Sequence, residues 1–84
     1  MSTVDVVVGE DFWTDIETGT EALVDRWLVT EGDRVTQGQP LANVVLVKAN
    51  HEVGAPTGGV IERILVRAEQ TFARGQSLAV IRKT

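Results

Sequence analysis

Two stretches of the chain decide the fold: LVDRWLVTEGDRVTQGQPLANV at residues 23–44 and VIERILVRAEQTFARGQSLAVI at residues 60–81. At an offset of 37 residues, seven of the 22 aligned pairs are identical. These pairs are Arg26 and Arg63, Leu28 and Leu65, Val29 and Val66, Gly38 and Gly75, Gln39 and Gln76, Leu41 and Leu78, and Ala42 and Ala79. An internal repeat of this kind indicates two copies of one supersecondary unit, so we expect a pseudo-twofold axis.

The repeat also settles an ambiguous segment. Residues Ala22–Val29 would fit one face of a short helix as well as a strand. The second copy opens with Gly58-Gly59 and continues into branched apolar residues up to Val66, a pattern that favours a strand after a turn. By symmetry we expect the first copy to be a strand too. Each copy then runs through a polar segment and a Gly-Gln pair to another apolar run.

The segments outside the repeat complete an all-β pattern. The β-branched run Val4–Val8, ended by Gly9, favours an opening strand. Leu41–Val47 and Asn50–Val53 are expected to be strands joined by a tight turn over Val47–Asn50, with Lys48 at its tip. Short strands at regular spacing, without a confident helix, predict an antiparallel sandwich or flattened barrel. We expect residues 1–84 to form a single domain.

Composition argues against several classes of function. The 84 residues leave no room for a second core, and the net charge of −4 repels nucleic acid and anionic lipid. The longest apolar stretch, Leu41–Val47, is far shorter than the roughly 20 residues of a membrane helix. The N-terminus lacks a signal-peptide pattern, and the absence of cysteine suits a reducing compartment. From these features we expect a soluble, intracellular protein.

Few residues could support catalysis or metal binding. His51 is the only histidine, so neither a Ser-His-Asp triad nor a multi-histidine metal site is expected. Asp11, Asp15 and Glu17 lack the glycine-containing ligand loop of an EF-hand, and a solvated acidic loop over Glu10–Thr20 is the favoured interpretation. We therefore predict no catalytic residue and no metal.

The two tryptophans differ in their surroundings. Trp27 lies in the repeat and is expected to pack within or beside the core. Trp13 lies in the polar loop, where we expect it to be more open and available to anchor a partner.

Several motifs, taken together, carry a family resemblance. In order along the chain they are Trp27–Val35, Gly38–Ala42, Lys48-Ala49, Glu52–Pro56 and Gly59-Val60. This pattern resembles the lipoyl domain of 2-oxo acid dehydrogenase complexes over roughly residues 4–82. The biotinyl domain of biotin-dependent carboxylases is similar in fold, so the resemblance is more specific for the superfamily than for the cofactor.

The resemblance implies two four-stranded antiparallel sheets, with a modified lysine on the turn between central strands and the termini at the opposite end. The matching lysine is Lys48, flanked by Val47 and Ala49. The implied cofactor is lipoate bound covalently to Lys48, with biotin as the alternative. The family's acidic first loop corresponds to about Gly9–Glu17. It would place Glu10, Asp11, Phe12 and Trp13 beside the cofactor as a partner-recognition loop.

The lysine turn departs from the usual pattern. Lipoyl domains typically have Asp before the lysine, where this chain has Val47, and biotinyl domains have Met on both sides. The triplet Val47-Lys48-Ala49 instead resembles the turn of the glycine-cleavage carrier protein, which is also lipoylated.

The resemblance also implies a monomeric, non-catalytic carrier domain, either free-standing or part of a dihydrolipoamide acyltransferase component. Its implied partners are a lipoate–protein ligase and the decarboxylase, acyltransferase and dihydrolipoamide dehydrogenase components of a 2-oxo acid dehydrogenase-type complex. The rival hypotheses are a biotin carrier domain and an unmodified interaction module of the same fold.

Overall fold

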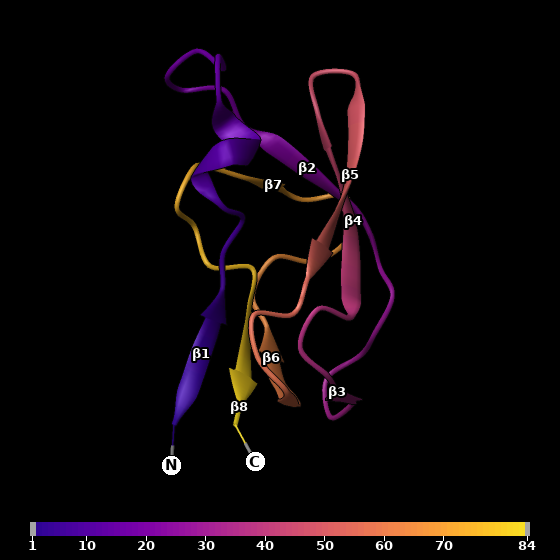
Figure 1. The fold of residues 1–84 in the computed structure, drawn as a ribbon. Helices are drawn as coiled ribbons and strands as arrows, with labels where there is room; N and C mark the ends of the chain where they lie inside the picture. Colours follow the sequence, from indigo (N-terminus) through magenta and orange to yellow (C-terminus); the bar gives the residue numbers. More distant parts are fainter. Residues whose placement is uncertain (1, 84) are drawn as a thin grey trace.

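The computed structural model describes residues 2–83, which form two four-stranded antiparallel sheets and one turn of 3₁₀ helix, η1 (Figure 1). The two-sheet, all-β architecture expected from the sequence is confirmed. One sheet has the order β1 (Thr3–Val6), β8 (Ala79–Arg82), β6 (Gly59–Ile64), β3 (Arg34–Val35). The other has the order β5 (Ala49–Gly54), β4 (Pro40–Leu46), β2 (Ala22–Trp27), β7 (Thr71–Phe72). The helical turn η1 covers Glu10–Trp13.

The 37-residue repeat is reproduced strand by strand. Across the two sheets, β2 corresponds to β6, β3 to β7 and β4 to β8. β2 and β6 share one pattern of buried and exposed positions. Each also has a pairing irregularity at the equivalent place, after Val24 in β2 and after Ile61 in β6. The ambiguous segment at residues 22–29 is therefore a strand, as the symmetry predicts, and it ends at Trp27.

The Gly-Gln pairs form the same turn in both copies. The amide of Thr36 donates to Oε1 of Gln39 at 3.1 Å, and the amide of Ala73 donates to Oε1 of Gln76 at 3.0 Å. The glycines before the two glutamines have φ of 86° and 80°, a region that L side chains rarely adopt. Both glycines therefore supply a backbone conformation that would be costly for other residues.

The two halves differ most in one connection. Fifteen residues (7–21) join β1 to β2, whereas only four (55–58) join β5 to β6. The longer connection contains η1 and lies at the same end of the molecule as the β4–β5 hairpin (Figure 1). The ends of the chain lie at the opposite end, where Thr3 pairs with Arg82. The molecule is elongated, with extents of 37 × 20 × 18 Å.

The core lies between the two sheets and is built from the inward positions of nearly every strand. Its largest fully buried side chains are Trp13, Phe72, Leu41, Ile61, Leu78 and Ile81. Trp27 is half-buried and packs against this cluster, as expected, while its Nε1 donates to the carbonyl of Val66 at 2.8 Å. Among residues 2–83, no helix is long and apolar enough to cross a membrane.

Gly59, the first residue of β6, is required by a close approach between strands. A Cβ built on Gly59 would overlap the carbonyl oxygen of Arg82 and lie 2.8 Å from the Ile81 side chain. Backbone atoms of a paired strand cannot move away as a flexible side chain can, so an added methyl group would separate β6 from β8.

We predict that Gly59→Ala lowers the free energy of unfolding by about 2–3 kcal/mol, because the added methyl overpacks the contact between β6 and β8. Urea unfolding followed by tryptophan fluorescence measures the change. Gly9→Ala is the matched control, since a Cβ at Gly9 meets nothing within 4 Å and its φ is −62°. Equal stability of the two variants would contradict this assignment.

Candidate functional site

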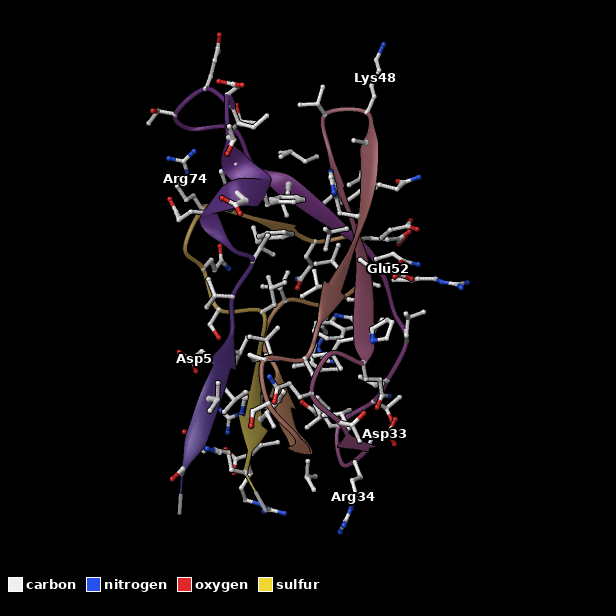
Figure 2. The ribbon with its side chains drawn as sticks, viewed as in Figure 1. Asp5, Asp33, Arg34, Lys48, Glu52 and Arg74 are labelled. Carbon is white, nitrogen blue, oxygen red and sulfur yellow. The ribbon has the colours of Figure 1, made fainter. Side chains whose placement is uncertain are left out.

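The β4–β5 hairpin presents Lys48 in a two-residue turn. Leu46, the last residue of β4, pairs with Ala49, the first residue of β5, so Val47 and Lys48 alone form the turn. The turn is therefore shorter than the Val47–Asn50 segment predicted from the sequence, because Ala49 and Asn50 already pair with β4. Lys48 is exposed, and its side chain points away from the molecule at the tip of the hairpin (Figure 2).

The hairpin is anchored firmly below its tip. Six residue pairs join β4 to β5, and β4 is also paired on its other side with β2. Val44 and Leu46 of β4 are buried in the core. Lys48 thus stands on a support whose backbone is hydrogen-bonded and whose inner face is packed.

Val47 adopts an unfavourable backbone conformation in this turn. Its φ is 59°, whereas the φ of Lys48 is not positive. A two-residue hairpin turn with positive φ at its first position alone has the pattern of type II′, which prefers glycine there. A β-branched residue in this region is strained. Val47 is also 71% exposed, so packing does not offset that strain.

The β1–β2 connection is anchored by Trp13. The sequence-based expectation that Trp13 is open to a partner is wrong, because its side chain is 1% exposed. Its ring meets Phe72 of β7 edge-to-face at 6.0 Å, and the Arg74 guanidinium lies over it at 5.8 Å. Nη2 of Arg74 also donates to the Trp13 carbonyl at 3.0 Å. A tryptophan in a polar stretch is buried here because η1 turns it onto the core.

The rest of η1 faces outward or toward the hairpin. Glu10 and Asp11 are exposed, as predicted for an acidic loop. Phe12 is half-buried and meets the ring of His51 on β5 edge-to-face, with centroids 4.8 Å apart and planes at 78°. The contacts of Phe12 and Trp13 therefore tie the connection to β5 on one side and to β7 on the other.

Sequence reasoning missed two residues of this site. The sequence offers His51 only as a catalytic or metal-binding candidate, and its contact with Phe12, 39 positions earlier, has no sequence signature. Arg74 occupies the repeat position of Gln37, so the symmetry gave no reason to expect its contact with Trp13. Both contacts depend on the long β1–β2 connection, whose counterpart between β5 and β6 has only four residues.

The Lys48 side chain fits covalent attachment of a carboxylic acid. Amide formation needs an accessible primary amine, and Lys48 is exposed on a turn that projects from the sheet. Any group attached there would extend into solvent rather than displace core side chains. Among the described residues, no three His, Cys, Asp or Glu side chains gather as metal ligands would.

We predict that Val47→Gly raises the free energy of unfolding by about 1 kcal/mol, because glycine removes the strain at positive φ. Thermal and urea unfolding measure the change. Val7→Gly serves as the control, since Val7 is 43% exposed and has no positive φ. It should lose up to about 1 kcal/mol through the added backbone entropy. A loss of stability in Val47→Gly would contradict the strain.

Comparison with known proteins agrees with this geometry. A family model described as "Biotin-requiring enzyme" (Biotin_lipoyl) matches residues 14–81. One relative is the dihydrolipoyllysine-residue acetyltransferase component of the acetoin cleaving system of Pseudomonas putida, which is 37% identical over 62 residues. The corresponding component of the Zymomonas mobilis pyruvate dehydrogenase complex is 40% identical over 65 residues. The lipoamide acyltransferase component of the Bacillus subtilis branched-chain complex is 34% identical over 65 residues.

These matches cover 74–77% of this chain but only 15–17% of each relative, so the chain corresponds to about one sixth of their length. The region that the family model matches includes the whole internal repeat and the Lys48 turn. The family match, the two-sheet fold with its pseudo-twofold repeat, and the exposed lysine at the hairpin tip agree with one another. The chain belongs to the biotinyl/lipoyl attachment-domain family.

Proposed function

We propose that Lys48 carries lipoate in amide linkage and that residues 1–84 are one carrier domain serving a 2-oxo acid dehydrogenase-type complex. The single observation that carries this proposal is the exposed amine at the tip of a two-residue turn on a firmly paired hairpin. The names of the relatives, which specify a dihydrolipoyllysine residue or lipoamide, favour lipoate over biotin. The flanking Val47 and Ala49 also differ from the methionines of biotinyl domains.

The work of the chain in this role is to hold and present one side chain. When bound, lipoate supplies a dithiolane that accepts and releases acyl groups and electrons. The chain fixes the backbone beneath Lys48 by pairing β4 with both β5 and β2. Because the support is rigid, the freedom of the arm is confined to the lysine side chain and its attached group. A positively charged amine at this tip is hydrated until the attaching enzyme removes its proton.

The domain itself is proposed to be a non-catalytic, monomeric carrier, either free-standing or part of an acyltransferase component. Its proposed partners are a lipoate–protein ligase and the decarboxylase, acyltransferase and dihydrolipoamide dehydrogenase components. A cytoplasmic location, or the mitochondrial matrix in a eukaryote, would give it access to these enzymes.

The β1–β2 connection is proposed to help the partners recognise the domain. Exposed Glu10, Asp11, Asp15 and Glu17 give this connection a negative surface at the hairpin end of the molecule. Such a surface favours the approach of an enzyme whose entrance carries basic residues. Phe12 is partly accessible beside these acids, whereas Trp13 acts from beneath as the anchor of the connection.

We predict that wild-type protein co-expressed with a lipoate–protein ligase gains one lipoyl increment in intact mass, located on Lys48 by peptide mapping. Lys48→Arg should gain none, because its guanidinium cannot form the amide. Lys83→Arg is the control, since Lys83 is exposed but lies at the opposite end, and it should be lipoylated as the wild type is. A biotin increment in the presence of a biotin ligase would support the biotin-carrier hypothesis. No increment with either ligase would support an unmodified module.

We predict that the lipoylated Asp11→Asn/Asp15→Asn variant has a several-fold higher KM than the wild type for the host's 2-oxo acid decarboxylase component at low salt. The reason is the loss of attraction between the acidic connection and a basic entrance. Asn also tolerates the positive φ of 63° at position 15.

The control for this experiment is Asp25→Asn/Glu62→Gln, which changes net charge equally at exposed positions of β2 and β6. Its KM should stay close to that of the wild type. At about 0.5–1 M salt the Debye length falls to a few ångströms, so the two double variants should converge. A KM in the loop variant equal to that of the control at low salt would contradict recognition by the connection.

A further inference from the structure

One contact between the β1–β2 connection and the Lys48 hairpin is a ring pair, Phe12 with His51. β5 alternates its faces, and the pairing of His51 with Val44 places His51 on the side of the sheet that carries the buried Val44. From this side the His51 ring meets Phe12 of η1 at 4.8 Å. His51 lies three residues beyond Lys48 along the chain, so the contact is close to the base of the turn.

A hollow lies beside this ring pair. It has a volume of about 170 Å³ and is lined by Val7, Val8 and Phe12 from the connection and by Val44, His51 and Val53 from the sheet. This hollow leaves part of the space between the connection and β5 unfilled, and the two rings contribute to its lining. Beside a hollow, an aromatic pair contributes a larger fraction of the interaction energy that holds the connection than it would in a close-packed interface.

Trp13, at the other end of η1, has anchors of its own, and its ring also meets that of Phe12 edge-to-face at 5.1 Å. Trp13 is buried against Phe72 and is bonded through its carbonyl to Arg74, a residue of the β7–β8 connection. None of these contacts involves β5. Losing the ring of His51 should therefore release the hairpin side of η1 while the core and the Trp13 anchor remain in place.

We propose that His51 is a positioning residue that holds the β1–β2 connection against the Lys48 hairpin, so that a partner meets the acidic connection and the lysine arm as one surface. This inference rests on the proposed carrier function for its biological meaning. The structural part concerns only His51 and Phe12. His51 acts through Phe12 and takes no part in the chemistry of the arm.

The first test is backbone ¹⁵N relaxation of unmodified protein with His51→Ala, His51→Phe and Asn50→Ala. In His51→Ala, the order parameters of the amides at residues 10–12 should fall from near 0.85 to below about 0.6, while those of Trp13 and of the β strands stay high. His51→Phe keeps an edge-to-face partner for Phe12 and should restore the wild-type values. Asn50→Ala removes a side chain from the opposite face of β5 and should change little.

The second test uses the same variants after lipoylation, with the host's 2-oxo acid decarboxylase component. His51→Ala should raise KM by about 2- to 10-fold, the range that an aromatic pair supports, with kcat little changed. His51→Phe should return KM to the wild-type value. If His51→Ala acted only by destabilising the fold, its free energy of unfolding would fall together with the rise in KM. Urea unfolding of each variant is therefore measured beside the kinetics.

The outcomes separate this inference from the proposed function. An absent lipoyl increment on the wild type would overturn the carrier proposal but leave the relaxation result standing. An ordered connection in His51→Ala, or a connection as mobile in His51→Phe as in His51→Ala, would overturn the positioning role even if Lys48 is lipoylated. Loosening in Asn50→Ala equal to that in His51→Ala would also overturn it, because the effect would then not depend on the ring pair.

Discussion

The β4–β5 hairpin has an apolar inner face that extends beyond the strands of the opposite sheet, and the rest of the structure depends on covering it. β4 has seven residues, whereas its repeat partner β8 has four. Leu46 nevertheless remains buried at the end of β4. Phe12 and Ile16, both from the long β1–β2 connection, pack against the same core cluster. A hairpin that projects in this way without a cover would expose its apolar face to water.

This constraint explains why one connection carries two tasks. The β1–β2 connection must place aromatic side chains on the core, and it must also leave its charged residues in solvent. The 3₁₀ turn η1 achieves both within four residues, since Glu10 and Asp11 are exposed, Phe12 is half-buried and Trp13 is buried. The acids lie at the same end of the molecule as the lysine because the aromatic side chains beside them are needed for packing. Position and charge at this end of the molecule therefore have a common physical origin.

The sequence predicted the parts of the structure that depend on local pattern and internal symmetry. The 37-residue repeat indicated a strand within Ala22–Val29, where periodicity alone was undecided, and the structure has that strand at Ala22–Trp27. The glycines that the repeat aligns, Gly38 and Gly75, form equivalent turns. It could not predict the burial of Trp13, because the neighbours in sequence are polar and the covering residues, Phe72 and Arg74, are about 60 positions away. The contact between Phe12 and His51 was inaccessible for the same reason.

The functional site is expected where the two halves of the molecule differ in structure. A repeat stabilises both copies by equivalent contacts, so the symmetric part of this fold does not mark either end of the molecule as a functional site. Symmetry is broken by the fifteen-residue connection at residues 7–21, and the turn at Val47 and Lys48 lies outside both copies of the repeat. Both departures lie at the hairpin end, and the strained φ of Val47 is found there as well. Local violations of otherwise consistent rules concentrate at functional sites, so the strained Val47 beside Lys48 supports placing the site at this turn.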